Sequence, residues 1–460
     1  PWSTLVRPSL ELARNGFVIE TYLADAIRSK AKHFRTMPNL GRTFTKNNDG
    51  VTLLEEGDLL VRKRYAETLE AIMDGGADAV YGGELAERLA KDIQDAGGII
   101  TSEDISSYRP VLRDPLISRV AGYTIAGAPP PSSGGGVIIG ALRFLSGFAT
   151  PYSATADALS KHWYVEACRH VFAIRMSLSD PKFAPEENQN AVNDLIEGDY
   201  METLRRMTLD DDVLDLSQYG GQRWAQLKNT DGGGALVDAQ EGDRRRRRRA
   251  ERTRDVSGSR NNRVSRDMRL FNYLEDHGTT SLSIVDKHRN TVTMTSSVNL
   301  NFGSKVVSPS TGIILNNQMD DFSSPGLVNY FGVSPSESNY VAPGKRPLSS
   351  MSPTMVFRDT NHHGPTETDS NGKISGKLVL SLGASGGPKI ITSVLQTILN
   401  YAFVGMPLYE SISAPRVHNQ LLYHGAAGTN VEEDTLPQGP DVRLSKRTRV
   451  ALERRGHKLI

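Results

Sequence analysis

A glycine and a threonine at positions 278 and 279 are residue types that support self-activating nucleophilic chemistry. If the bond between Gly278 and Thr279 is cut, the threonine gains a free α-amine beside its own hydroxyl, and that amine can act as the base that activates the hydroxyl. One residue then supplies both nucleophile and base. A turn that leads into a strand accounts for the same Gly-Thr-Thr tripeptide, so these residues alone leave both interpretations open.

The residues after Thr279 predict the element that would position it. Small polar and apolar residues alternate over 279–286 and again over 291–297, as they do on half-buried strands, and a short polar turn separates the two runs. The pattern predicts a hairpin with Thr279 at its open end, beside Ser297 and Asn299.

A buried strand is predicted at residues 312–316, and polar side chains follow it. Asn317, Gln318 and Asp321 stand where such a strand would end, a position from which side chains can grip a polar ligand. The neighbouring aspartates could also bind a metal ion, but the ligand spacing expected for a hard cation is missing.

Two further segments could complete a site. Ser349 and Ser350 offer adjacent hydroxyls to a carboxylate, although two serines in a Pro-rich turn explain the same residues. The strand pattern at 377–382 runs into Gly-Ala-Ser-Gly-Gly, where Gly386 and Gly387 would expose backbone N–H groups at the start of a helix. Such groups can stabilise the oxyanion that forms when a hydroxyl attacks an amide carbon.

These motifs, taken in order, resemble the γ-glutamyltransferase (γ-glutamyltranspeptidase) family along nearly the whole chain. The resemblance rests on five segments: Asp276-His277-Gly278-Thr279-Thr280, Asn299-Leu300-Asn301-Phe302-Gly303, 312–323, 347–354 and Gly383-Ala384-Ser385-Gly386-Gly387. It implies that Thr279 is the nucleophile, released by self-cleavage after Gly278. Ser297 would hydrogen-bond this nucleophile, in the place of a threonine that is common in relatives, and Gly386 and Gly387 would form the oxyanion hole.

The resemblance also implies how a substrate is held. Asn299, Gln318 and Asp321 would bind the α-amine of a γ-glutamyl group, since a carboxylate and carbonyl oxygens then face an ammonium. Ser349 and Ser350 would bind its α-carboxylate. No metal site and no cofactor are implied.

An α+β fold of the N-terminal-nucleophile hydrolase type follows from the resemblance, with two stacked β-sheets between helical layers in an αββα sandwich. One precursor would give a large subunit, of which residues 1–278 are part, with a basic insertion at about 235–270, and a small subunit, of which residues 279–460 are the catalytic part, and the two would form a heterodimer. The implied activity is that of a γ-glutamyltransferase and glutathione hydrolase. It would pass the γ-glutamyl group of glutathione or a related compound to water or to an amino-acid or dipeptide acceptor. Family members suggest an extracellular, membrane-anchored or vacuolar location.

Three features of the match bear on the substrate site. Relatives bind the substrate carboxylate partly through an arginine upstream of the region where this chain begins. The chain also stops before the family's last strands, so we expect a fragment of a longer protein. Phe331 lies near the place where some bacterial relatives have an aromatic lid residue.

Composition adds little beyond a globular class. The chain has 460 residues, 38% of them hydrophobic and 23% charged, and a net charge of +1 that names no partner. The single cysteine, Cys168, is expected in the core and forms no internal disulfide. His162 and His170 lie on a predicted amphipathic helix and are expected to be packing or surface residues rather than metal ligands, because no zinc-type spacing occurs.

A run of six arginines at 244–249, with further arginines after it, is the one strongly charged stretch. It cannot bury a core, so a solvated loop is expected. A nucleic-acid patch is the alternative, disfavoured because no aromatic residue interleaves the run before Phe271.

Two competing functions stay open at this point. A cephalosporin-acylase or glutaryl-acylase type of hydrolase would share the fold and nucleophile, but Asp321 with Ser349 and Ser350 suits an amino-acid head group better. A non-catalytic relative could bind acidic partners through its arginine run, and nucleic-acid binding with a steep salt dependence would support that function.

Overall fold

The computed structural model describes the chain except residues 149–157, 227–277, 360–373, 375 and 436–440. The predicted basic insertion, with Asp276 and His277, lies outside the described residues. The rest divides into two compact units, a first of Pro1–Leu112 with Ser297–Gln318 and a second of Arg113–Ser296 with Met319–Ile460. Each unit therefore draws on both sides of the predicted cleavage bond, and the division of the precursor at Gly278 stays a prediction.

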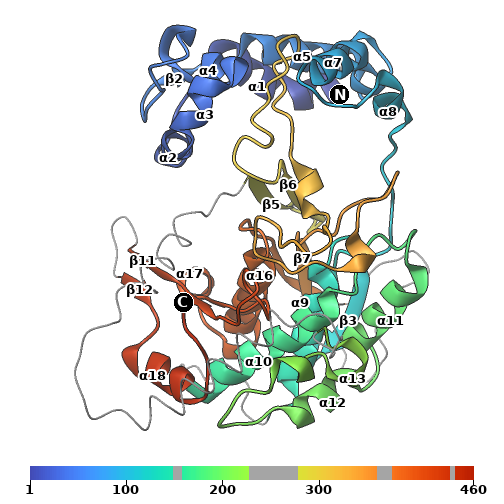
Figure 1. Cartoon of the computed structure of the whole chain (residues 1–460), viewed down its shortest axis with the longest axis vertical. Coiled ribbons are helices and arrows are strands. Elements are labelled where there is room, and N and C mark those ends of the chain that lie inside the picture. The colour runs from blue at the N-terminus through green and yellow to red at the C-terminus, as the bar shows by residue number, and fades with distance from the viewer. Residues whose placement is uncertain (149–157, 227–277, 360–373, 375, 436–440) are drawn as a thin grey trace. The chain divides into compact units, whose positions relative to one another are not determined.

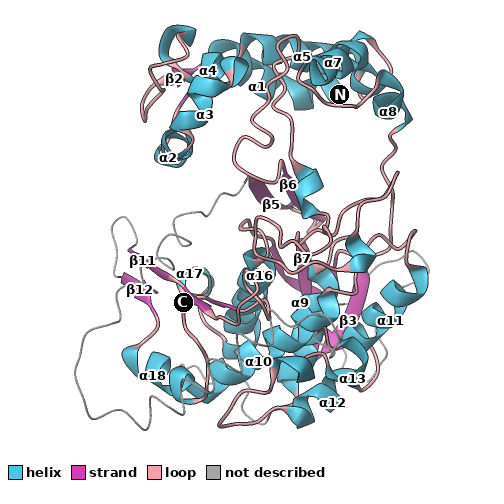
Figure 2. Cartoon of the chain, viewed as in Figure 1, coloured by secondary structure: helices cyan, strands magenta, loops and turns pink. Residues whose placement is uncertain are grey.

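The first unit is mainly helical (Figure 2). Its elements are α1 (Trp2–Asn15), β1 (Phe17–Val18), α2 (Thr21–Ser29), α3 (Ala31–Thr36), α4 (Pro38–Phe44), η1 (Lys46–Asn48), β2 (Leu59–Leu60), α5 (Lys63–Gly75), α6 (Asp78–Tyr81), α7 (Glu84–Asp95) and α8 (Ser102–Ser107). The later segment Ser297–Gln318 is anchored among them by Phe302, whose ring centroid lies 5.4 Å from that of Phe34 and 4.9 Å from that of Phe44. Burial of these three aromatic rings fixes a segment distant in sequence onto the helices.

The strand predicted at 312–316 is wrong. Only Ile314 pairs, in an isolated antiparallel bridge with Val307, and Gly312 has a φ of +70°, which breaks an extended run. The segment instead folds back on itself, and Asp92 of α7 accepts hydrogen bonds from Ser308 and Ser310 in its turn. An apolar run of this length does not reveal whether a partner strand is present.

The second unit holds the larger core (Figure 1). Its elements begin with β3 (Leu116–Val120), β4 (Tyr123–Gly127), α9 (Gly134–Ser146), α10 (Ala158–Arg175), α11 (Pro185–Ile196), α12 (Tyr200–Met207), η2 (Leu216–Gln218), α13 (Gly221–Trp224), β5 (Thr279–Val285) and β6 (Thr291–Ser297), whose last residue belongs to the first unit. They continue with η3 (Gln318–Asp321), which starts at the last residue of the first unit, then η4 (Glu337–Asn339), β7 (Thr354–Arg358), β8 (Lys377–Leu382), α16 (Lys389–Ile398), the π-helix η5 (Leu399–Val404), α17 (Leu408–Ser413), β9 (Val417–His418), β10 (Asn430–Val431), β11 (Glu433–Thr435), β12 (Asp441–Arg443) and α18 (Lys446–Arg454). None of the described helices has both the length and the apolar character needed to cross a membrane.

A four-stranded antiparallel sheet of order β3-β4-β7-β8 organises this unit. Register places Ile125, Val356 and Leu380 opposite one another across three strands, and all three are buried in the core with residues of α9, α10 and α16. The helix α9 approaches β4 closely, since a Cβ on Gly127 would lie 2.6 Å from the Cα of Gly135. Glycines at this contact let the helix start directly against the sheet.

The predicted hairpin is confirmed. Strands β5 and β6 pair, and residues 286–290 form the turn between them. The Asp286 carboxylate accepts hydrogen bonds from the backbone N–H groups of His288 and Asn290, both at 2.8 Å, which fixes the turn. The mixed helix and strand content confirms an α+β fold.

Candidate active site

Thr279 is the first residue of β5, as predicted, and it is half-buried. Polar side chains further along the strand bind across to β6. The Ser281 hydroxyl donates to the Met294 carbonyl at 3.3 Å, and the Ser283 hydroxyl donates to Thr293 Oγ1 at 3.1 Å. These hydrogen bonds hold the strand that carries the candidate nucleophile.

The predicted oxyanion loop lies between β8 and α16. Gly386 has a φ of +126° and Gly387 a φ of +57°, values that favour glycine. Their carbonyls accept hydrogen bonds from the N–H groups of Lys389 and Ile390, both at 3.1 Å, which begins the helix. A Cβ on Gly383, at the start of the loop, would collide with the Ser281 hydroxyl. The structure therefore brings the loop against the strand of Thr279, within one unit.

The predicted carboxylate-binding serines are held by a dense set of backbone hydrogen bonds. The Ser349 N–H donates to the Pro131 carbonyl at 2.7 Å, and both the N–H and the hydroxyl of Ser133 donate to the Ser349 carbonyl at 2.8 Å. The Ser349 hydroxyl oxygen accepts from the Met351 N–H at 3.1 Å. Since this oxygen already accepts, its hydrogen is available to donate to a ligand.

The Ser350 hydroxyl is also oriented so that its hydrogen can be donated to a ligand. Its hydroxyl oxygen accepts a hydrogen bond from the guanidinium of Arg175 at 2.9 Å, and the Arg175 Nε–H donates to the Ser133 hydroxyl oxygen at 3.0 Å. Two neighbouring hydroxyls are thus set as donors, which suits an anionic ligand.

Asp321 is tied to the same segment through Asn339, a side chain with only 4% of its surface exposed. The Asn339 amide donates to the Asp321 carbonyl at 2.8 Å and accepts from the Leu348 N–H at 2.9 Å. Burial lowers the pKa of Arg175 to about 10, and the charge of Asp321 opposes that shift. Ser350 thus contacts the Arg175 guanidinium, and the charge of Asp321 acts on the same group.

Ser297, Asn299 and Gln318 belong to the first unit, where the structure groups them around one turn. The Ser297 hydroxyl oxygen accepts from the Asn299 N–H at 2.8 Å, and the Asn299 side-chain amide donates to the Asn317 carbonyl at 3.2 Å. Asn299 has a φ of +71° and is buried. The Gln318 N–H donates to the Asn316 side chain at 2.9 Å. The Asn299 side-chain nitrogen is thus engaged in a hydrogen bond, and its amide oxygen is an acceptor.

Phe331 covers the oxyanion loop. A Cβ on Gly387 would lie 2.6 Å from the Phe331 ring, so the ring packs directly on that glycine. The Phe331 carbonyl accepts a hydrogen bond from Gln420 at 3.1 Å, and Gln420 in turn contacts His418 at 2.9 Å. This arrangement places an aromatic ring over the loop.

Comparison with known proteins decides the family. The sequence profile described as Gamma-glutamyltranspeptidase matches residues 1–460. The chain belongs to the γ-glutamyltranspeptidase family. It is 34% identical to "Glutathione hydrolase 2" of Arabidopsis thaliana over 461 residues, which cover 100% of this chain and 67% of that protein. It is 32% identical to "Glutathione hydrolase proenzyme" of Escherichia coli K12, over 92% of this chain and 61% of that protein.

A solved structure shares the fold. The crystal structure of cephalosporin acylase from Bacillus halodurans aligns with a TM-score of 0.69 and 20% identity, covering 100% of this chain and 67% of that one. At this identity the likeness shows the fold alone. The chain spans 61% to 67% of the length of the two curated relatives named above.

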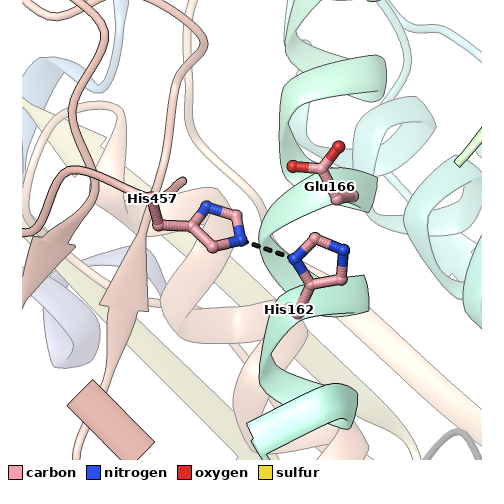
Figure 3. Close-up of side chains that lie close together, drawn as sticks. All are labelled: His162, Glu166 and His457. Atoms are coloured by element: carbon pink, nitrogen blue, oxygen red, sulfur yellow. Dashed lines mark hydrogen bonds between the residues drawn. The ribbon is translucent and has the colours of Figure 1, made fainter. Parts of the chain in front are cut away.

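Another group of polar side chains, His162, Glu166 and His457, lies towards the amino end of α10, whereas Arg175 is at its carboxyl end (Figure 3). His162 and Glu166 stand one helical turn apart, and His457, from the carboxyl end of the chain, faces them. Their potential ligand atoms all lie within 4.8 Å of one another, and all three residues are buried. Metal-type spacing did not predict this cluster because His457 is 295 positions away from His162.

Hydrogen bonds already occupy most donor and acceptor atoms of this cluster. His162 Nε2 lies 2.6 Å from the Leu209 carbonyl and must donate to it, so His162 Nδ1 accepts from His457 Nε2 at 2.7 Å. The Glu166 carboxylate accepts from Arg169 at 3.1 Å and from the Tyr219 hydroxyl at 2.6 Å. A metal ion would have to displace these bonds beside a buried guanidinium, so the cluster fits a structural role.

The cluster residues behave electrostatically as a neutral histidine pair. Burial lowers the pKa of His457 to about 2 and also lowers the pKa of His162. Both rings are therefore uncharged near neutral pH. His162 packs as predicted, and Cys168 on the same helix is buried as predicted, with its pKa raised to about 12 by burial.

Sequence patterns missed three residues that shape the site: Arg175, Ser133 and Asn339. One weak signal could have found the first, because Arg175 ends the apolar run Val171-Phe172-Ala173-Ile174 and a helix face of that kind is buried. Ser133 and Asn339 carry no local signal, since their partners lie far away in sequence.

Proposed function

We propose that the whole protein containing this chain is a self-processing γ-glutamyltransferase and glutathione hydrolase with Thr279 as its nucleophile. The observation that carries the proposal is the position of Thr279 at the start of β5, the strand whose Ser281 lies against Gly383 at the start of the loop that holds Gly386 and Gly387. Family membership and the names of the curated relatives support it.

In the first step, Thr279 Oγ attacks the carbonyl carbon of Gly278. The peptide nitrogen leaves as the α-amine of Thr279, and an ester joins the Gly278 carbonyl to Oγ. Water then hydrolyses the ester, giving a carboxylate on Gly278 and a free hydroxyl and amine on Thr279. The products are one piece that ends at Gly278 and one that begins at Thr279, which stay together as a heterodimer with the αββα layering of an N-terminal-nucleophile hydrolase.

In turnover, the Thr279 α-amine takes the proton of its own hydroxyl while Oγ attacks the γ-amide carbon of the donor. The N–H groups of Gly386 and Gly387 stabilise the oxyanion, and Ser297 orients Oγ through a hydrogen bond. The leaving amine takes the proton and departs, which leaves a γ-glutamyl ester on Thr279. Water or the amine of an amino-acid or dipeptide acceptor then attacks this ester. No cofactor takes part.

Recognition of the γ-glutamyl head group uses both of its charges. Asp321, Asn299 and Gln318 accept hydrogen bonds from the α-ammonium, and Ser349 and Ser350 donate to the α-carboxylate. An acylase for neutral or purely anionic acyl groups would have no use for the Asp321 carboxylate, which distinguishes the two functions. Glutathione and its conjugates carry the required head group.

The test begins with the intact mass of the purified whole protein. Two pieces, the second with Thr279 at its amino end, are expected. Rates on γ-glutamyl p-nitroanilide and on glutaryl p-nitroanilide, which lacks the α-amine, are then compared. The γ-glutamyl substrate should have the higher kcat/KM by at least about 100-fold, because the glutaryl group leaves Asp321 unpaired. A folded chain that stays uncut, or equal rates on both substrates, would contradict the proposal.

A further inference from the structure

Arg175, the last residue of α10, carries a buried guanidinium that contacts no carboxylate among the described residues. Only 4% of its surface is exposed. Its hydrogen-bond acceptors are the hydroxyl oxygens of Ser133 and Ser350, both neutral, and its guanidinium carbon lies 5.9 Å from the centre of the Phe172 ring. No carboxylate lies within ion-pair distance of Arg175 in the described part of the chain.

The contrast with another arginine of the same helix shows that this is unusual. Arg169 is also buried, and it meets the Glu166 carboxylate at 3.1 Å. Buried charges in proteins are normally paired, because a charge removed from water without a counter-charge is costly. The opposite charge that acts on Arg175 is that of Asp321, and no ion pair between the two side chains is seen among the described residues. A bound anion beside Ser350 would supply the missing counter-charge.

The geometry indicates where such an anion would bind. The Arg175 guanidinium donates to Ser350 Oγ, so the hydroxyl hydrogen of Ser350 is directed to a different acceptor. The Ser349 hydroxyl is set in the same way by the Met351 N–H. A carboxylate that accepts from both serines would lie one hydroxyl away from the guanidinium, where its attraction is weakly screened by solvent.

We propose that Arg175 is a positioning residue of the substrate-carboxylate pocket, which orients the Ser350 hydroxyl as a donor and supplies the positive charge behind it. This inference rests on the proposed function. It makes Arg175 the element of this chain that selects donors with an α-carboxylate. The residue acts through Ser350 and does not take part in the bond-breaking step.

The test compares two donors on the same enzyme: γ-glutamyl p-nitroanilide and γ-aminobutyryl p-nitroanilide, which keeps the amine and lacks the α-carboxylate. Arg175→Gln should raise KM for the first about 10- to 100-fold with kcat within about threefold, because binding present equally in ground and transition states is lost. For the second, kcat/KM should change less than about threefold. Arg175→Lys keeps the charge without the planar fork, so its KM should lie between those of the wild type and Arg175→Gln.

Arg143→Gln is the matched control, since Arg143 is a partly buried arginine of α9 that donates to the Gly198 carbonyl, away from the serines. Its ratio of kcat/KM between the two donors should equal that of the wild type. In a Ser350→Ala background, Arg175→Gln should add little further loss on γ-glutamyl p-nitroanilide, because both changes remove the same hydroxyl-directed interaction.

The possible results distinguish a failure of the role proposed for Arg175 from a failure of the proposed γ-glutamyltransferase function. A wild-type protein that turns over neither donor overturns both. A wild-type protein active on the γ-glutamyl donor, with Arg175→Gln losing the same factor on both donors, overturns the inference alone. If Arg175→Gln does not fold by thermal melting, Arg175→Lys carries the test, and an equal loss on both donors again overturns the inference.

Discussion

The two ends of α10 hold polar clusters of opposite character. Towards its amino end, His162 and Glu166 form hydrogen bonds within the protein. The buried Glu166 carboxylate accepts from the Arg169 guanidinium and from the Tyr219 hydroxyl. At its carboxyl end, within the described part of the chain, the Arg175 guanidinium donates to two neutral hydroxyls, and those hydroxyls keep hydrogens to donate. The first cluster, here called the closed cluster, has little capacity left for a ligand. The second, here called the open cluster, is incomplete until an anion binds.

This difference separates structural from functional polar groups better than burial does. His162, Glu166 and Arg175 are all buried. What distinguishes them is how many of their hydrogen-bonding atoms and charges the protein itself satisfies. We therefore expect changes in the closed cluster to reduce stability, and changes around the open cluster to reduce turnover.

The largest effect is expected at Thr279, the proposed nucleophile. Thr279→Ala should leave the chain uncut and lower turnover of γ-glutamyl p-nitroanilide by at least about 10³-fold, because nucleophile and base are lost together. Intact mass and steady-state rates measure both effects. Thr280→Ala, at the exposed next position of β5, is the control and should be cleaved and active. Cleavage between residues 278 and 279 in Thr279→Ala would show that another group is the nucleophile.

The next largest effect should lie in the closed cluster. Glu166→Ala leaves the Arg169 guanidinium buried without its counter-charge, so the free energy of unfolding should fall by about 3–5 kcal/mol. Ser350→Ala in the open cluster should cost about 1 kcal/mol or less, because water can replace a half-exposed hydroxyl. Urea denaturation of both variants measures the difference. Equal losses of stability in the two variants would contradict the assignment of a structural role to the closed cluster and a functional role to the open cluster.

A pH effect of intermediate size is expected from His170, between the two clusters on α10. Burial lowers its pKa to about 3, and its Nδ1 accepts a hydrogen bond from the Gly220 N–H at 3.2 Å. Below about pH 6.5 the unfolded state therefore binds a proton at His170, whereas the folded state stays unprotonated there until about pH 3. The free energy of unfolding thus falls as the pH decreases from 6.5 towards 3. One histidine contributes a slope of up to about 1.4 kcal/mol per pH unit.

His170→Asn keeps an acceptor for Gly220 and removes the titration. Its free energy of unfolding, followed by urea denaturation from pH 7 to pH 4, should decline less steeply than that of the wild type by about that slope. Parallel declines in the two proteins would mean that His170 is protonated in the folded state.

The smallest effect is expected from metal ions. Because the ligand-type atoms of His162 and Glu166 are already hydrogen-bonded, neither a chelator nor added Zn²⁺ should change the melting temperature or the turnover. Real binding at a hundredfold excess over Kd would add about 2.7 kcal/mol of stability. If Zn²⁺ stabilised the wild type but not His457→Gln, the closed cluster would be a metal site, contrary to the prediction.

Local patterns predicted the parts of the site that depend on local structure. Alternation over 279–297 predicted the hairpin, and the glycine run after 377–382 predicted a turn into a helix, because strand period and positive φ are properties of neighbouring residues. The strand predicted at 312–316 failed for the opposite reason. Pairing needs a partner strand, and a short apolar run does not specify one.

The sequence by itself led to the hairpin that begins at Thr279, to the turn of Gly386 and Gly387 into a helix, and to the family whose resemblance proposes their roles. Only the tertiary structure decided that Arg175 is buried against Ser133 and Ser350, and that His162 meets His457. Partners separated by 175 or 295 positions leave no trace in local periodicity. Whether a charge is satisfied depends on which distant segments surround it, and that is a property of the folded chain.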